Sequence, residues 1–149
     1  MRLKRTPGDK WFSDCVRIAV NWTCENCQRP FGGRAQGLHC SHWIGRGISY
    51  ATRFDPMNAF AHCYKCHSIL GADTPAFYDY ARQELGDIGI EILTRRKYDT
   101  ALGKLFKQAD KGGEKSELAR HFKAEFKHME GIRNDGYTRK LEFEAWSPE

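Results

Sequence analysis

The sequence predicts an α+β fold in which helices surround one short pair of strands, and three observations support this prediction. Apolar residues recur at helical spacing before residue 22 and again after residue 73. Two short segments between these regions, 38–44 and 58–61, are candidates for strands. Two C-x-x-C pairs, at 24–27 and 63–66, enclose both segments. We therefore expect a small core between the cysteine pairs, with helices on either side of it.

The first helix is predicted over residues 8–21. One face of this segment carries apolar side chains at i, i+3, i+4 and i+7, namely Phe12, Cys15, Val16 and Ala19. Cys15 is therefore expected to be a small core residue. The stretch Q-R-P-F-G-G-R-A-Q-G after the first cysteine pair is rich in glycine and turn formers, which excludes long regular structure there.

The central part of the chain is predicted to be a strand, a loop and a second extended segment. Residues 38–44 are the first strand, and residues 45–57 form a loop that carries Arg46 and Arg53. Residues 58–61 are expected to form either a second strand or a turn that leads into the second cysteine pair.

A helix is predicted to start at D-T-P, residues 73–75, because a capping side chain precedes a proline in the first helical turn. Its apolar face is Phe77, Tyr80, Ala81 and Leu85, and Gly86 is its predicted end. Residues 88–106 are expected to be helical in part. We place a domain boundary here, with a core over 1–86 and a helical extension over 87–149.

Ser116 can cap a last helix, whose apolar face is formed by Leu118, Phe122, Phe126 and Met129. This face has to pack either on the core or on a second subunit, so a homodimer is one expectation. No regular structure is predicted for residues 131–149.

The charge of the chain is uneven. Net charge is +5 over 149 residues, but residues 1–53 carry nine Lys or Arg against three Asp or Glu, and residues 54–94 carry two against six. A basic surface attracts polyanions, most often nucleic acid, although the same bias can be a solubilising one. No run of about 18 apolar residues occurs, so neither a membrane span nor a secretory signal is expected.

The two C-x-x-C pairs predict a structural zinc site. Six cysteines without an export signal argue against a disulfide framework, and a thioredoxin-like redox pair would need a single C-x-x-C in a βαβ setting. Each C-x-x-C turn places two thiolates on one side of a knuckle, and two knuckles complete a tetrahedron about Zn²⁺. The predicted ligands are Cys24, Cys27, Cys63 and Cys66. Such an ion can supply on the order of 10 kcal/mol of folding free energy.

Histidines and an asparagine lie between and beside these cysteines in a recognisable order. The succession His42, Asn58, Cys63-x-x-Cys66, His67 resembles the HNH endonuclease motif on its ββα-metal, treble-clef-like scaffold. In that family the first histidine is the general base, the asparagine fixes the hairpin, and the last histidine binds the catalytic metal. The resemblance implies these roles for His42, Asn58 and His67.

The runs DKWFSDCVRIAVNWTCENC and HCSHWIGRGISYATRFDPMNAFAHCYKCHSILG are similar to the phage recombination protein family NinG/Rap. The shared features are a helix before the first knuckle, a histidine followed by an aromatic residue, an arginine-bearing loop and an R-F-D-x-x-N segment. The similarity covers about residues 8–86. It implies a nuclease of phage homologous recombination that cleaves branched DNA, such as D-loops and Holliday junctions, in the cytoplasm of the host. Host or phage recombination proteins would be its partners.

The chemistry of the residues is consistent with phosphodiester hydrolysis. A neutral imidazole at His42 can accept the proton of the attacking water. A catalytic Mg²⁺ or Mn²⁺ held by His67 would neutralise charge on the phosphate. The amide of Asn58 can bridge backbone groups and orient His42. Arg46 and Arg53 are candidate phosphate contacts, or else part of a solvated basic face.

One position departs from the HNH pattern. Many HNH enzymes place an acidic metal ligand immediately before the general base, and here that residue is Ser41. On a strand, His39 shares a face with Ser41 while His42 points the other way. His39 could therefore replace the absent ligand of the catalytic ion.

Two other classes of function stay open at this stage. The protein could be a zinc-stabilised accessory protein that binds branched DNA without cutting it, or a zinc adaptor that binds proteins. Among the remaining candidates, His62 is expected to be structural, Trp43 and Tyr50 to pack in the fold, and His121 and His128 to lie on the surface.

Overall fold

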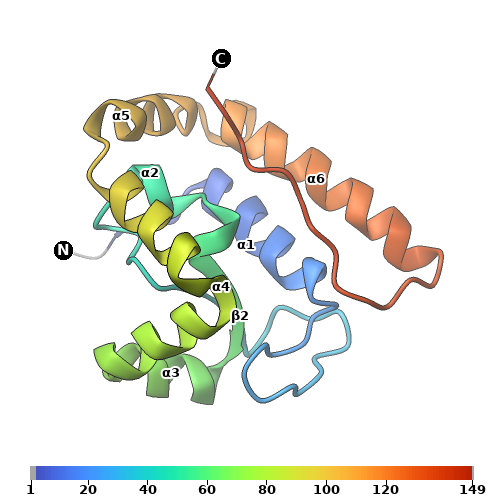
Figure 1. Ribbon diagram of the computed structural model, residues 1–149. Coiled ribbons are helices and arrows are strands. Elements are labelled where there is room, and N and C mark those ends of the chain that lie inside the picture. Colours follow the sequence, from blue (N-terminus) through green and yellow to red (C-terminus); the bar gives the residue numbers. More distant parts are fainter. Residues whose placement is uncertain (1–2, 149) are drawn as a thin grey trace.

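The computed structural model describes residues 3–148 (Figure 1). The α+β prediction is confirmed: over these residues, six α-helices surround one two-stranded antiparallel hairpin. The elements in chain order are α1 (Pro7–Ala19), β1 (Leu38–His42), α2 (Tyr50–Arg53), the 3₁₀ helix η1 (Pro56–Asn58), β2 (Ala59–Cys63), α3 (Tyr64–Ala72), α4 (Thr74–Lys97), α5 (Thr100–Ala109), the 3₁₀ helix η2 (Gly113–Lys115) and α6 (Glu117–Asn134).

The hairpin and α3 form a ββα unit at the centre of the molecule. Leu38 lies opposite Cys63 and His42 lies opposite Ala59, so the second extended segment is a strand rather than a turn. Helix α3 follows β2 without a linker, and the Cys63 sulfur caps it by accepting a hydrogen bond from the Cys66 N–H. The loop between the strands contains α2 and η1, two short helices that the sequence analysis missed.

Helix α1 covers one face of the hairpin. A capping box fixes its first turn: Thr6 accepts a hydrogen bond from the Asp9 N–H, and the Asp9 carboxylate accepts one from the Thr6 N–H. Phe12 and Cys15 from α1 are buried, as predicted, and they belong to one core with Leu38 of β1. This packing fixes the helix against the strand that carries His39 and His42.

The other face of the hairpin is covered by α3 and α4. Phe60 of β2 packs there with Leu70, Phe77, Ala81 and Ile90. Gly86 does not end the helix as predicted, because α4 resumes after a kink at which this glycine adopts φ 72° and ψ 170°. A glycine permits this positive φ without a Cβ clash, so the chain can turn and continue in helical form.

The boundary drawn at residue 86 does not separate two cores. Phe106, Leu118 and Phe122 lie in the same buried cluster as Phe12 and Leu38. Figure 1 shows α6 lying along α1, and the extended segment after α6 runs back beside both helices. The extension therefore packs on the core of its own chain, and the apolar face of α6 no longer argues for a second subunit.

Helix α6 continues to Asn134, four residues into the 131–149 stretch for which no regular structure was predicted. Residues 135–148 have no helix or strand, and residue 149 lies outside the described residues. The segment after α6 is nevertheless anchored. The Leu141 N–H donates a 2.8 Å hydrogen bond to the Ala19 carbonyl at the end of α1. Phe143 and Trp146 pack against the main core. Over residues 3–148, no helix is both long enough and apolar enough to cross a bilayer.

Candidate metal centre and histidine cleft

The four predicted cysteines meet in one cluster. The sulfurs of Cys24, Cys27, Cys63 and Cys66 all lie within 4.8 Å of one another, and the sulfurs of Cys27 and Cys63 are 3.8 Å apart. A tetrahedron with Zn–S bonds of about 2.3 Å has edges of about 3.8 Å, so the cluster has the size that zinc requires. Three of the four side chains are buried and Cys27 is exposed. The described residues contain no disulfide, and these four cysteines could hold a structural Zn²⁺.

Hydrogen-bond donors surround the sulfurs. The Cys27 N–H donates to Cys24 Sγ at 3.5 Å, and the Asn26 side-chain amide donates to Cys66 Sγ at 3.3 Å. Burial raises the pKa of the Cys24 thiol, but backbone N–H donors more than offset this and lower the pKa to about 7. Burial and the neighbouring sulfurs raise the pKa of Cys66 to about 12. Thiolates crowded this closely repel one another, and a bound cation would relieve the repulsion between them.

A polar cleft lies along the free edge of β1, between α1 and α3. Its volume is about 650 Å³, and it is lined by all three histidines singled out in the sequence, His39, His42 and His67. Arg46 from the loop after β1 also lines it. The structure thus brings together four candidate residues that are up to 28 positions apart in the chain.

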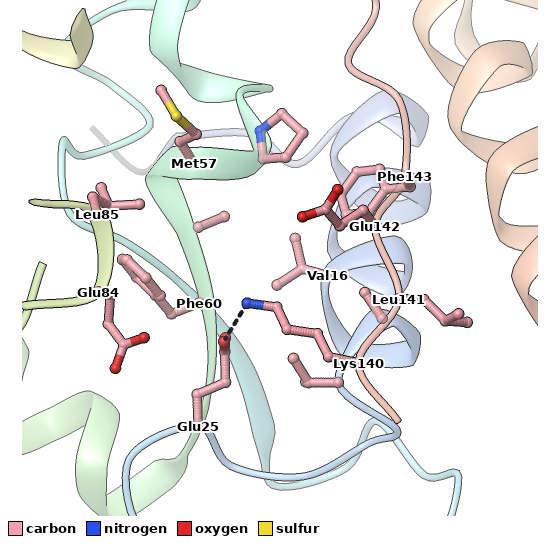
Figure 2. A pocket seen from close by; sticks show the side chains of 14 residues that line it. Val16, Glu25, Met57, Phe60, Glu84, Leu85, Lys140, Leu141, Glu142 and Phe143 are labelled. Carbon is pink, nitrogen blue, oxygen red and sulfur yellow. Dashed lines mark ion pairs between the residues drawn. The ribbon is translucent and has the colours of Figure 1, made fainter. Parts of the chain in front are cut away.

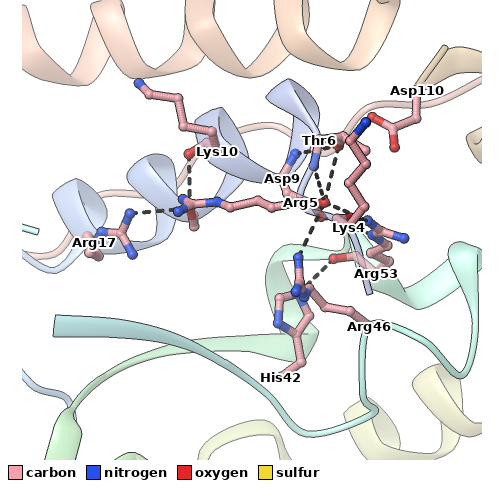
Figure 3. A network of polar contacts seen from close by, with 11 residues as sticks. Lys4, Arg5, Thr6, Asp9, Lys10, Arg17, His42, Arg46, Arg53 and Asp110 are labelled. Atoms are coloured by element: carbon pink, nitrogen blue, oxygen red, sulfur yellow. Dashed lines mark hydrogen bonds and ion pairs between the residues drawn. The ribbon is translucent and has the colours of Figure 1, made fainter. Parts of the chain in front are cut away.

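His42 is held in one orientation by a backbone contact. Its Nε2 lies 2.9 Å from the Arg53 carbonyl oxygen, which can only accept, so Nε2 carries the hydrogen (Figure 3). The lone pair is then on Nδ1, for which the described residues provide no hydrogen-bond partner. Burial lowers the pKa of His42 to about 4, and the Arg46 guanidinium adds to this effect while the Arg53 carbonyl opposes it. The ring is therefore neutral at pH 7.

His39 and His67 stack on each other beside His42. Their ring centroids are 5.0 Å apart and the planes differ by 17°. The Nδ1 atom of His67 is buried and has no hydrogen-bond partner, and burial together with His39 lowers the pKa of this ring. Imidazole nitrogens are ligands that suit transition-metal ions. Over the described residues, however, no third His, Cys, Asp or Glu joins them, since the cysteine cluster is the one group of three or more such ligands.

The expected alternation along β1 is present in the structure. Ser41 and His39 pair across the hairpin with Phe60 and His62, whose side chains face α4, whereas His42 packs on Phe12 of α1. Although they start from opposite faces of the strand, the rings of His39 and His42 border the same cleft because β1 is the open edge of the hairpin.

Asn58 is fully buried and takes no direct part in the cleft. Its Nδ2 donates hydrogen bonds to the carbonyls of Ile44 at 2.9 Å and Thr52 at 3.0 Å, and its Oδ1 accepts from the Ile44 N–H at 2.8 Å. The side chain therefore ties together both ends of the loop that connects the strands. These contacts are of the kind expected from the sequence, where the Asn58 amide was to bridge backbone groups of the loop and orient His42.

The two predicted phosphate contacts differ sharply. Arg53 is 2% exposed, and its guanidinium makes a bidentate contact with the Asp9 carboxylate. Its side chain is committed to a buried ion pair, so its assignment to DNA binding was wrong for this structure. Arg46 is 30% exposed at the cleft and lies 3.3 Å from the same carboxylate, where it remains accessible to a ligand.

The residues that form one wall of the cleft were not among the candidates identified from the sequence. Asp9, Ser13 and Arg17 line it from α1, and Arg5 lines it from the segment just before the helix. The three helical residues follow one another at intervals of four, which places them on one helical face. The four-residue spacing of these polar side chains indicates a second, polar face on the helix, beside the apolar face that packs in the core.

The remaining candidates have structural surroundings. His62 is fully buried between Phe60 and Tyr80, and both of its ring nitrogens lack partners. Trp43 and Tyr50 pack against the cores, as expected. His121 hydrogen-bonds the Glu144 carbonyl at 2.8 Å. These contacts leave His39, His42 and His67 as the histidines of the cleft.

Comparisons of the chain with protein-family models, with curated proteins and with solved structures found no match.

Proposed function

We propose that the protein is a metal-dependent DNA endonuclease that hydrolyses phosphodiester bonds in the histidine cleft. The observation that carries this proposal is the state of His42: a neutral imidazole, oriented through Nε2, with its Nδ1 lone pair unpaired, in a cleft lined by arginines. A general base has to be deprotonated and oriented before it can act, and both conditions are met here.

In the proposed reaction, His42 Nδ1 accepts a proton from water as the water oxygen attacks phosphorus. The bond between phosphorus and the 3′ oxygen breaks, and the departing oxygen takes up a proton from solvent. The Arg53 carbonyl stabilises the imidazolium that forms, since Nε2–H donates to it at 2.9 Å. Arg46 is accessible to a non-bridging phosphate oxygen.

His39 and His67 are the residues that would hold the catalytic ion. The ion would neutralise negative charge on the phosphate and on the departing oxygen. Imidazole donors suit Fe²⁺, Ni²⁺, Cu²⁺ and Zn²⁺, whereas Mg²⁺ and Mn²⁺ favour oxygen ligands, which the phosphate and water would have to supply here. The reaction is therefore to be assayed with Mg²⁺ and Mn²⁺ and also with a later transition metal such as Ni²⁺.

Branched DNA is the proposed substrate, as the similarity to the NinG/Rap family implies. D-loops and Holliday junctions are the first candidates, in the cytoplasm of a phage-infected cell and alongside host or phage recombination proteins. A homodimer would match the two-fold symmetry of a junction, although the apolar face of α6 is already covered within one chain.

The proposal is tested with labelled four-way junction, D-loop and linear duplex, each incubated with zinc-loaded protein and Mn²⁺ or Mg²⁺. We expect cleavage of branched DNA by the wild type and a loss of about 10²–10⁴-fold in rate for His42→Ala. His128→Ala, an exposed histidine on α6, is the matched control and should cleave normally. If His42→Ala and His128→Ala cleave branched DNA at equal rates, His42 is not the general base.

A second candidate function is binding of branched DNA without cleavage. It is supported by the lack of an acidic ligand beside His39 and His67, since Asp9, the carboxylate in the cleft, is already paired with Arg53 and Arg46. This alternative predicts that wild type and His42→Ala bind a junction equally and that neither cuts it with any divalent ion.

A further inference from the structure

The polar face of α1 has an arrangement that the proposed cleavage reaction does not use. Arg5 precedes the N-cap of α1 and Arg17 lies 12 positions later, in its last turn, yet both guanidiniums reach the hydroxyl of Ser13. Arg5 Nη2 donates to Ser13 Oγ at 2.7 Å and Arg17 Nη2 donates to the same oxygen at 3.2 Å. Figure 3 shows the two side chains approaching each other along the helix.

The Ser13 hydroxyl is oriented to receive both arginines. It donates its own hydrogen to the Lys10 carbonyl at 2.9 Å, which leaves its lone pairs for the guanidiniums. Two positive groups on one neutral oxygen repel each other, and a neutral hydroxyl offers little charge compensation. Arg17 has a carboxylate partner in Asp14, but Arg5 forms no ion pair within the described residues, so an anion in the adjacent space would compensate its charge.

Arg17 is incompletely paired although it is buried. It is 6% exposed and pairs with the Asp14 carboxylate at 2.7 Å, but its Nε has no hydrogen-bond partner. An unpaired buried donor is costly, so this guanidinium has one N–H that no protein acceptor satisfies. The carboxylate that lines this cleft, Asp9, is occupied by Arg53 and Arg46 and cannot serve.

We propose that Arg5, Ser13 and Arg17 form a phosphate-binding site on α1, which holds the backbone of a nucleic-acid strand in the cleft that contains His42. The identity of the ligand as DNA backbone rests on the proposed function. Guanidinium groups match the oxygens of a phosphodiester in geometry as well as charge, and the cleft is continuous from these arginines to His42. Helix α1 is then a DNA-binding element as well as a part of the core.

The test measures binding of a fluorescein-labelled four-way junction and a linear duplex by anisotropy at several salt concentrations. The zinc-loaded His42→Ala protein is the parent, so the DNA stays intact. Arg5→Gln is the main variant, because Arg5 is exposed and its replacement spares the core. Arg120→Gln, an exposed arginine on α6, is the control with the same change in charge. Ser13→Ala removes the bridging hydroxyl without changing charge.

We expect Arg5→Gln to weaken binding several-fold and to reduce the slope of log affinity against log salt by about 0.9 in magnitude, as the loss of one phosphate contact requires. Ser13→Ala should weaken binding with an unchanged slope, and Arg5→Lys should restore the slope. If Arg5→Gln binds like Arg120→Gln, the site is disproved.

Cleavage by the wild-type protein, measured on the same DNA, separates this inference from the proposed function. If Arg5→Gln reduces the salt slope but the wild type cuts no DNA, the phosphate site is supported and the nuclease proposal is wrong. If the wild type cuts DNA but Arg5→Gln leaves the salt slope unchanged, the nuclease proposal is supported and the phosphate site is wrong. A parent protein that binds no DNA at low salt would reject both.

Discussion

The cysteine cluster and the histidine cleft share one hairpin but are built in opposite ways. The cluster is closed: four sulfurs from two knuckles lie within 4.8 Å of one another, and backbone N–H groups of the same knuckles surround them. The cleft is open, and its walls come from α1, β1, the following loop and α3. The comparison indicates that the cysteine cluster joins the two knuckles, whereas the neighbouring edge of β1 stays open to a ligand.

Asp9 connects the histidine cleft to helix α1 and to the loop between the strands. It caps α1, neutralises the buried Arg53 and pairs with Arg46 at the cleft. Because the carbonyl of Arg53 orients His42, the carboxylate acts on the imidazole through one residue. The cleft therefore depends on an ion pair that lies outside the ββα unit.

Removal of zinc should produce the largest effect. Cys63→Ser, or chelation of the wild type, removes on the order of 10 kcal/mol of metal-dependent folding free energy, so the hairpin should unfold at 25 °C. Near-ultraviolet circular dichroism and elemental analysis would measure this. Cys40→Ser, which lies outside the cluster, should retain one zinc per chain. A folded, metal-free Cys63→Ser protein would show that the cluster is not needed.

Asp9→Asn should produce the next largest effect. The substitution leaves the 2% exposed Arg53 without its counter-ion, which costs about 3–5 kcal/mol for a buried pair. Urea denaturation would measure the change in the free energy of unfolding. Glu91→Gln, which breaks an exposed pair with Arg95, is the control and should cost less than about 1 kcal/mol. If Asp9→Asn and Glu91→Gln lower the free energy of unfolding by the same amount, the Asp9–Arg53 pair does not stabilise the cleft.

Asn58→Asp should be destabilising by about 1–3 kcal/mol, although the side chain keeps its shape. The carboxylate can still accept from the Ile44 N–H, but it cannot donate to the carbonyls of Ile44 and Thr52. The midpoint of thermal unfolding would report the change, and the cleavage rate should fall with it because His42 loses its alignment. An unchanged rate in a destabilised variant would limit Asn58 to a stabilising role.

The smallest effect concerns pH. Since the pKa of His42 is lowered to about 4, the base stays neutral down to mildly acidic pH, and kcat/KM should fall only as pH drops toward 4. Arg46 lowers this pKa by its charge, with Asp9 opposing it, so Arg46→Gln should move the acid limb to higher pH. Zinc content has to be measured at each pH, because protonation of the thiolates releases the ion. A limb near pH 6.5 would indicate that the ring is exposed in solution.

Local patterns in the sequence were sufficient to predict the four-cysteine cluster and the longer helices α1 and α6, but not the short helices α2, η1 and α3. Cysteine spacing identified all four sulfurs, and helical periodicity identified α1 and the buried face of α6 that contains Phe122. The same logic failed at Gly86, because whether a helix ends or kinks at a glycine depends on what the next turn packs against. Residues whose partners are distant in sequence were harder to assign.

Arg53 shows why the cleft was only partly predictable. Its position in an arginine-bearing loop suggested a phosphate contact, but its carboxylate partner lies 44 residues earlier, on α1. Only the tertiary packing of α1 against the hairpin makes that pair, and the same packing brings Arg5 and Arg17 to the cleft. Sequence spacing carries no information on which arginine finds an internal partner.

The most direct test of the account compares zinc content, fold and DNA cleavage on the same sample of His42→Ala. We expect one zinc per chain, a circular dichroism spectrum and junction affinity like those of the wild type, and a cleavage rate lower by two orders of magnitude or more, about the range expected for loss of a general base. A variant that keeps its zinc and its fold and cuts DNA at the wild-type rate would contradict the assignment of the reaction to this imidazole.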